Sequence, residues 1–332
     1  MRQLLNRLKR QLLSHVYVMR ALLAVAAIAL VTAAFVLFRG PISLVRSLSS
    51  SSLPSHSNRT NFLLLGVAGG THESPNLTDT IIFVSISPSS SPVLLTIPRD
   101  FWVPSLRAKV NTAYHYGVAK AGPSGGLILA KSAVSEVIDQ PVDFAVVFDF
   151  ATFSRVIDEI GGIDVRVERT FTDAQYPIAG KENDPCDACR YETITFSQGL
   201  QHMDGATALK FVRSRHSEDL DEGTDFARSR RQTLVIGAIK TKLLSKIDFG
   251  LYRRLIALIS QNTQTDVTPD HYTALAKLAW SSRQYTPKTA ALTEPDHLYN
   301  PPLLPQYGRQ WILLPRSDDP TVIYNFVSGL LK

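Results

Sequence analysis

The segment ALLAVAAIALVTAAFVLF at residues 21–38 constrains this chain most, because it is long, apolar and uncharged. Together with the apolar residues 16–19 it approaches the roughly 20 residues that a helix needs to cross a bilayer, although Arg20 interrupts the run. The segment predicts a transmembrane helix over residues 16–38. A helix buried in a soluble core would not be expected beside so basic a flank.

Basic residues gather around this segment. Eight of the 35 Lys and Arg residues, and none of the 29 Asp and Glu residues, lie in residues 1–72. The formal net charge of +6 therefore belongs to the N-terminal end, whereas a nucleic-acid-binding domain would carry a basic excess on its folded part. Five basic residues precede the apolar run and only Arg39 follows it closely. This bias predicts a cytoplasmic segment over residues 1–20 and a single-pass protein whose folded domain lies outside the cell membrane.

A cleavable signal peptide is the alternative. It requires a shorter apolar region and a small-residue cleavage site of the A-x-A kind. The following residues, RGPISLVRSLSS, contain no such site. We therefore favour an uncleaved signal anchor, followed by a flexible Ser-rich linker over residues 39–59.

The rest of the chain predicts an α/β fold. Continuous apolar runs predict strands buried on both faces at 62–67, 80–87, 92–97 and 143–148, with a last strand in QWILLP at 310–315. Apolar periodicity predicts helices at 126–139, 150–160, 204–212, 226–244, 251–261 and 270–280, and at the C-terminal end. This order indicates a three-layer α-β-α domain with a central mixed sheet.

Residues 168–200 are polar and predict a long excursion that holds Cys186 and Cys189. A redox or zinc centre would need a thioredoxin-like context or a second pair of ligands, and the sequence shows neither. Outside the membrane, a local disulfide is the favoured state of the C-x-x-C pair, with two free loop thiols as the alternative.

Arg99 and Asp100 stand in TIPRDFWVP, at the exit of a buried strand. Strand ends in open sheets face the crevice where ligands bind. We expect Arg99 to project there with Asp100 holding its guanidinium. A structural ion pair that closes a turn is the alternative interpretation.

A second group of arginines lies in FVRSRHSEDLDEGTDFARSRRQ at 211–232. Arg213 and Arg215 share one face if the segment after the helix is extended. Arg228, Arg231 and Gln232 share one face of the next helix, and Arg230 lies opposite and is expected to be solvated. The alternative is an exposed helix balanced by nearby acidic residues. Converging arginines indicate a phosphate or pyrophosphate ligand, because the guanidinium fork binds phosphate oxygens in pairs.

A pyrophosphate usually needs a divalent cation that carboxylates help to hold. The segment GVAGGTHESPNLTDT at 66–80 places His72, Glu73 and Asp79 after a buried strand. It lacks the Gly-Lys-Ser/Thr ending of a Walker loop.

The motifs LLLG, TDTIIF, TIPRDFWVP, KVNTAYHYG, IDEIGGIDV, ALKFVRSR and DFARSRRQ occur in the order of one family. With them the chain resembles the LytR-CpsA-Psr proteins over residues 60–245, and residues 246–332 resemble a C-terminal extension of the same domain. The resemblance implies a phosphotransferase that moves a glycopolymer from a polyprenyl-pyrophosphate carrier to peptidoglycan, assisted by magnesium or manganese.

The resemblance also implies roles for individual residues. The catalytic set is Arg99, Asp79 and Asp100. The pyrophosphate-binding residues are Arg99, Arg213, Arg215, Arg228, Gln232, Lys109 and Asn111. Asp100 and Asp225 orient arginines, and Asp79 with Glu73 holds the metal.

One position departs from the family pattern. The family commonly has an Asp two residues after the glycine of LLLG, and here the residue is Ala68. Glu73 is expected to replace it, because magnesium prefers oxygen ligands, and His72 is expected to be a loop residue. Two other functions stay open: a non-catalytic module that binds wall polymer or polyprenyl pyrophosphate, and a hydrolase of lipid pyrophosphates. A transcriptional regulator is disfavoured, because no helix-turn-helix pattern is evident.

Overall fold

The computed structural model describes residues 52–332 except 71–73, 179, 182–183, 218, 220, 246–247, 283 and 286. The predicted membrane segment at 16–38 and Glu73 lie outside the described residues. Within the described range, no helix has the length and apolar character needed to cross a bilayer. The described chain forms two compact units. The first unit comprises residues 52–68, 76–148 and 263–332, and the second comprises 69–75 and 149–262.

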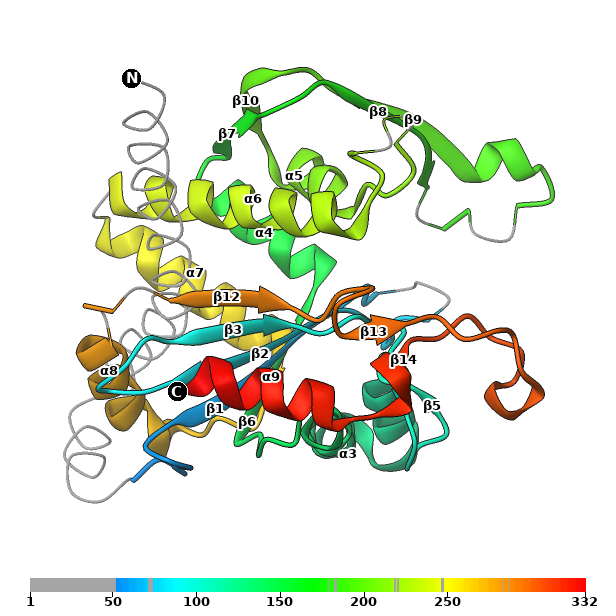
Figure 1. Cartoon of the computed structure of the whole chain (residues 1–332). Coiled ribbons are helices and arrows are strands. Elements are labelled where there is room, and N and C mark those ends of the chain that lie inside the picture. The colour runs from blue at the N-terminus through cyan, green and yellow to red at the C-terminus, as the bar shows by residue number, and fades with distance from the viewer. Residues whose placement is uncertain are drawn as a thin grey trace, which may run out of the picture. The chain divides into compact units, whose positions relative to one another are not determined.

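The first unit is built on a six-stranded mixed sheet in the order β11-β6-β1-β2-β3-β12 (Figure 1). The strands are β1 (Thr60–Val67), β2 (Thr78–Ile86), β3 (Val93–Thr96), β6 (Phe144–Asp149), β11 (Thr263–Thr265) and β12 (Lys288–Ala291). β1, β2 and β3 pair antiparallel in sequence, as the predicted hairpin requires, whereas β12 joins β3 in parallel. The predicted α/β class with a central mixed sheet is confirmed.

Helices cover both faces of this sheet because successive strand residues point to opposite sides. Leu63 and Leu65 of β1 belong to the core beneath α3 (Thr112–Ile138) and α9 (Thr321–Leu331). Phe62, the neighbour of Leu63 on the opposite face of β1, packs instead with residues of α8 (Tyr272–Ser282). The continuous apolar runs that predicted doubly buried strands therefore reflect two separate cores.

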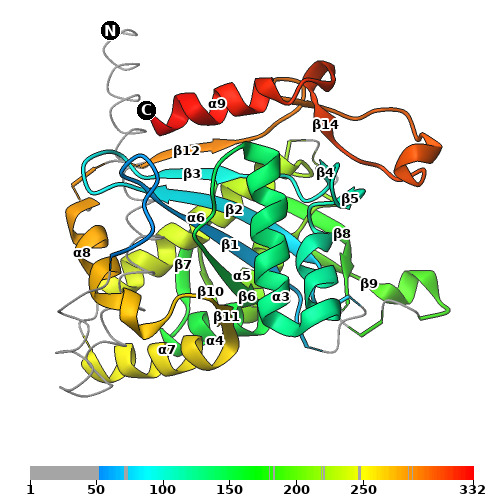
Figure 2. The same cartoon turned by 90° about the horizontal axis from the view of Figure 1, so that it is seen from below.

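α3 is longer than the predicted helix at 126–139 and is broken in the middle. Ala121 and Gly122 have non-helical backbone angles, and the two halves lie side by side (Figure 2). A Cβ added to Gly117 would come within 2.3 Å of the carbonyl oxygen of Gly125. This approach of two backbones therefore requires glycine, which is the reason for the Gly-rich composition here.

The second unit packs four helices against two β-ribbons. Its helices are α4 (Phe150–Glu159), α5 (Gly205–Arg213), α6 (Asp225–Ser245) and α7 (Phe249–Asn262). Its strands are β7 (Ile163–Val167), β8 (Phe171–Pro177), β9 (Tyr191–Phe196) and β10 (Gly199–Met203). Phe171, Phe196 and Phe211 form its aromatic centre, with ring centroids 5.0–6.0 Å apart. Asp204, the first residue of the helix predicted at 204–212, caps α5 by accepting a hydrogen bond from the Thr207 amide.

Two expectations need correction. Residues 168–200 are not only an excursion: β8 and β9 pair into an antiparallel arm, and the disulfide Cys186–Cys189 lies in the segment between them. QWILLP was predicted as the last strand, but the last strand of the six-stranded sheet along the chain is β12, which forms one edge of that sheet. In QWILLP, only β14 (Leu314–Pro315) pairs, with β13 (Leu298–Tyr299), because the prolines around them limit the ladder. A further short pair joins β4 (Trp102–Val103) to β5 (Ala108–Lys109).

Candidate functional site

In the first unit, Arg99 is the centre of a charged network just beyond β3. Its Nη1 donates to Oδ1 of Asp79 at the start of β2, and its Nε donates to Oδ2 of Asp100 at 3.4 Å. Lys109 Nζ of β5 donates to the other oxygen of Asp100 at 2.8 Å. The sequence predicted the Asp100 contact, but Asp79 is the partner that only the pairing of β2 with β3 could reveal.

The network is fixed by backbone bonds as well as by charge. The amide of Asn111 donates to the carbonyl of Arg99, and the amide of Thr78 donates to the carbonyl of Asn111, each at 3.2 Å. Asn111 therefore ties the end of β3 to the start of β2. Its side-chain Oδ1 is buried and receives no hydrogen bond from any described residue. Buried polar atoms normally have partners, so this oxygen stands out as an unsatisfied acceptor beside the network.

The guanidinium of Arg99 stays reachable from solvent. Its side chain is 30% exposed, and those of Asp79 and Asp100 are 36% and 15% exposed. Partial burial lowers the pKa of Arg99, but the charges of Asp79 and Asp100 outweigh it, and the pKa is raised overall. Arg99 is thus a permanent, oriented cation, as an anion-binding site requires.

The residues present fit a magnesium ion only in part. Asp79 uses Oδ1 for Arg99 and offers Oδ2 as a hard oxygen ligand, which suits a metal that is bound by one or two carboxylates and substrate phosphates. Glu73, the second expected ligand, lies outside the described residues. In the described part of the chain, one cluster of His, Cys, Asp or Glu side chains has metal-site spacing, Asp184 with Cys186 and Cys189. Its sulfurs are joined in a disulfide, so they are not thiolate ligands.

In the second unit, Arg213 is the last residue of α5 and lies among aromatic rings. Its guanidinium carbon is 4.4 Å from the centroid of the Phe150 ring and 5.7 Å from that of Tyr176. Its Nη1 also donates to the Tyr176 hydroxyl at 3.3 Å. Stacking on rings holds a guanidinium in one orientation without neutralising its charge. Tyr176 was not predicted, because it lies on the β8–β9 arm, far from Arg213 in sequence.

Asp173 holds the turn that carries Arg213 and Arg215. Its Oδ2 accepts from the Ser214 hydroxyl at 2.7 Å and from the amides of Arg215 and His216 at 3.0 and 3.2 Å. The carboxylate is fully buried, which raises its pKa, but these hydrogen bonds outweigh burial and leave the pKa lowered. Ser214 has an extended ψ of 135°, so the chain leaves the helix between the two arginines, as the extended interpretation expected.

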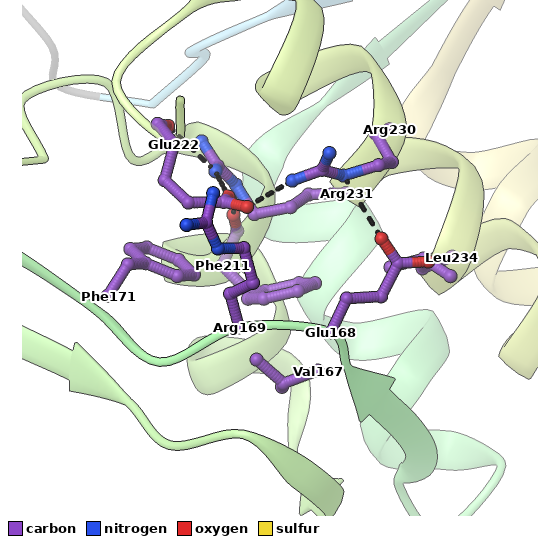
Figure 3. Close-up of a pocket in the computed structure, with 9 residues that line it drawn as sticks. All are labelled: Val167, Glu168, Arg169, Phe171, Phe211, Glu222, Arg230, Arg231 and Leu234. Atoms are coloured by element: carbon purple, nitrogen blue, oxygen red, sulfur yellow. Dashed lines mark hydrogen bonds and ion pairs between the residues drawn. The ribbon is translucent and has the colours of Figure 1, made fainter. Parts of the chain in front are cut away.

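Arg231 is a structural residue and not a surface one (Figure 3). It is 1% exposed and donates to the carbonyls of Phe211, Ser214 and Glu222 and to the Glu222 carboxylate. The sequence placed it on one helix face with Arg228 and Gln232, and Arg231 is buried whereas the other two are partly buried. Arg230 was expected to be solvated, but its guanidinium pairs with the buried Glu222 and with Glu168. No sequence signal distinguished Glu222 from the other acidic residues of its loop.

The remaining predicted residues lie on the same elements. Arg215 is partly buried beyond α5, and Arg228 and Gln232 are partly buried on α6. Asp225 begins α6, and its side chain lies outside the described ones. The structure thus joins Arg99, Asp79, Asp100, Lys109 and Asn111 within the first unit and orients Arg213 and Arg215 within the second. Convergence of the two sets on one ligand stays a prediction.

Comparison with known proteins agrees with this picture. Residues 43–295 match the model of the LytR_cpsA_psr family. Biofilm regulatory protein A of Streptococcus mutans is 27% identical over 62% of this chain and 50% of its own length. The polyisoprenyl-teichoic acid–peptidoglycan teichoic acid transferase TagV of Bacillus subtilis is 28% identical over 57% of this chain and 44% of its own length. The solved structure of B. subtilis TagV shares the fold, with a TM-score of 0.55, 23% identity, and coverage of 83% of this chain and 98% of that one.

Proposed function

Because this chain belongs to the LytR_cpsA_psr family, we propose that it is a phosphotransferase that moves a glycopolymer from a polyprenyl-pyrophosphate carrier to peptidoglycan. The chain spans about half the length of the first curated relatives it matches, and TagV is named as a teichoic acid transferase. The observation that carries the proposal is the Arg99 network, a solvent-reachable cation oriented by two carboxylates at a strand end.

The chemistry follows from charge placement. An acceptor hydroxyl of peptidoglycan attacks the sugar-linked phosphorus, and the bond from that phosphorus to the bridging oxygen breaks, releasing polyprenyl phosphate. Phosphoryl transfer of this kind depends mainly on positioning and on stabilising negative oxygens. In this proposal Arg99 binds the pyrophosphate, and the family resemblance gives the same role to Arg213, Arg215, Arg228 and Gln232. Lys109 and Asn111 line the same site.

Asp79 has two tasks in this proposal. It orients Arg99 through Oδ1, and Oδ2 helps to hold a magnesium or manganese ion. When bound, the ion would neutralise charge on the pyrophosphate oxygens. Ala68 cannot ligate it, so Glu73 is the expected second carboxylate.

Location follows from the N-terminal segment. We propose that residues 16–38 span the cell membrane once, that residues 1–20 stay in the cytoplasm, and that the folded units lie outside, where peptidoglycan is assembled. The lipid bilayer is then a partner as well, since it holds both the carrier and the anchor. No nucleic-acid partner is proposed, because the basic excess lies beside the membrane segment.

The test compares variants of Arg99. Arg99→Ala should weaken binding of a polyprenyl pyrophosphate by about 10-fold or more, because hydrogen bonds between charged groups contribute about 1.5–3 kcal/mol. Arg99→Lys should restore little, since an ammonium cannot form the paired contacts of a guanidinium. Arg254→Ala is the control: Arg254 is an exposed arginine paired with Glu159, and its loss should leave binding unchanged. If Arg99 only closes a turn, its loss will lower the melting temperature and leave affinity unchanged.

Two measurements separate the alternatives. Transfer leaves labelled polymer covalently on peptidoglycan, whereas a hydrolase releases it into solution. A binding module, which the Ala68 departure motivates, would retain affinity for the pyrophosphate without turnover at any magnesium concentration.

A further inference from the structure

The loop between β13 and β14 exposes large apolar side chains. We call residues 300–311 the apolar loop. Leu303, Leu304 and Trp311 are 59%, 38% and 46% exposed. In both views the loop extends away from the sheet of its own unit (Figures 1 and 2). It lies beyond residue 295, where the family match ends, and the transfer activity proposed above assigns it no role.

The tip of the apolar loop turns back on itself through the short 3-10 turn Pro305–Tyr307 and its local hydrogen bonds. The carbonyl of Leu304 accepts from the amides of Tyr307 and Arg309, each at 3.1 Å. At the base of the loop, Asn300 Nδ2 donates to the carbonyl of Ile312 at 2.7 Å. The Tyr307 and Trp102 rings pack edge to face, with their centroids 5.1 Å apart. Prolines at 301, 302 and 305 restrict the backbone further. The exposed side chains are therefore held outward by the structure.

The composition of the apolar loop favours one kind of partner. From residue 298 to residue 315 the sequence contains no Asp or Glu, and Arg309 is its one Lys or Arg. Trp with Leu around a basic residue is the composition of segments that lie in the headgroup region of a bilayer. A typical protein interface would bring a larger area and more polar groups than three side chains offer.

We propose that the apolar loop inserts Leu303, Leu304 and Trp311 into the interfacial region of an anionic bilayer, with Arg309 among the lipid headgroups. The inference rests on the membrane anchor proposed above. Residues 39–51 connect the predicted span to the described chain, and thirteen residues reach at most about 45 Å when extended. A tether of this length keeps the loop near the bilayer at a high effective concentration, so a weak interfacial contact suffices.

The consequence is a fixed orientation. An anchor alone leaves the folded chain free to rotate on its linker. A second contact at the apolar loop sets how the first unit, with Arg99, stands above the lipid surface from which a polyprenyl carrier is taken.

The test places the full chain in nanodiscs of anionic lipid, one chain per disc. A nitroxide is attached at Leu303→Cys, and at Leu200→Cys as the control, because Leu200 of β10 is 66% exposed on the second unit. The native cysteines are joined in a disulfide and do not react. For each label, the relaxation caused by dissolved oxygen is divided by the relaxation caused by a water-soluble nickel chelate. This ratio should be several-fold higher for the label at residue 303 than for the label at residue 200. Fluorescence quenching by brominated lipid should be larger in the wild type than in Trp311→Phe.

Each other outcome contradicts the proposal. Equal access of the nickel chelate to both labels places the loop in water. If the label at residue 303 is protected from the nickel chelate only when two chains share a disc, the loop contacts a second copy. If the label is protected but Trp311 is not quenched, the loop contacts another surface of the chain. Equal protection in zwitterionic lipid refutes the anionic partner. A chain that stays out of the discs refutes the anchor and this inference together, whereas loss of transfer with an intact loop contact concerns only the proposed activity.

Discussion

At the scale of residues, two buried charged side chains hold the backbone of the second unit's arginines. Asp173 accepts hydrogen bonds from the turn after α5, and Arg231 donates to the carbonyls of Phe211 in α5 and of Ser214 at its end. Both charges are compensated, as buried charges must be. In the proposed function, these two side chains would act on ligand binding only through the position of Arg213 and Arg215.

Arg231→Met should lower the free energy of unfolding by about 3–5 kcal/mol, because removal of one partner leaves a buried charge without its pair. Because Glu222 would still form its ion pair with Arg230, we expect a loss at the lower end of that range. Chemical denaturation measures the loss. Arg254→Ala, which removes an exposed arginine, should change stability by less than about 1 kcal/mol. Equal losses in the two variants would show that Arg231 is not the structural residue described.

Asp173→Asn tests the lowered pKa of Asp173. A carboxyl whose pKa is lower when folded stabilises the protein fully above its ordinary value of 3.8, and this contribution is lost as pH falls through the folded value. Wild type should therefore lose more stability than Asp173→Asn between about pH 5 and about pH 3. At neutral pH the variant should be less stable by about 1–3 kcal/mol, from weakened bonds to a charged acceptor. Parallel acid profiles would contradict the assignment.

At the scale of elements, α3 shows how glycine permits a fold that periodicity alone would not indicate. The two halves of α3 meet at Gly117 and Gly125, with Gly126 against the Tyr114 ring. Gly117→Ala should destabilise the protein by about 1–3 kcal/mol, because a backbone carbonyl cannot move aside as a flexible side chain can.

The matched control is Gly329→Ala on α9, where an added Cβ meets nothing within 4 Å. That change should stabilise the protein by about 0.5–1 kcal/mol through helix propensity. Thermal unfolding of the two variants should shift in opposite directions. A shift in the same direction would mean that the halves of α3 do not meet at Gly117.

The β8–β9 arm carries the disulfide at Cys186 and Cys189, which closes a very short loop. Loop entropy gives an upper limit of about 2 kcal/mol for so short a closure. Replacing both cysteines with serine should raise amide exchange in residues 178–190 and leave polymer transfer largely intact. Loss of transfer in a folded variant would assign the pair a role in the reaction.

At the scale of the whole molecule, the proposed activity goes together with the proposed membrane anchor. We predict that residues 16–38 are retained, because no small-residue cleavage site follows them. Mass determination of the protein isolated from membranes should give the full chain of 36.7 kDa. A mature chain that begins near residue 40 would show that the segment is a cleaved signal peptide.

The sequence by itself determined features whose causes are local. Continuous apolar runs predicted β1, β2, β3 and β6, because a strand that is buried on both faces carries apolar residues at successive positions. Helix ends were equally local. Asp204 caps α5, and Gly161 and Gly162 take left-handed angles after α4, since each needs only its near neighbours. Arg99 and Asp100, adjacent in sequence, were predicted as a pair for the same reason.

Only the tertiary structure decided the contacts between distant segments. Asp79 reaches Arg99 because β2 lies beside β3, and the short β12 became an edge strand by pairing with β3 across nearly 200 residues. Arg231 and Arg230 look alike in sequence, yet one is buried, because Phe211, Ser214 and Glu222 fold around it. Charge alone could not separate them. What separates a structural arginine from a binding one is which partners the fold brings within hydrogen-bond distance, and that depends on long-range packing.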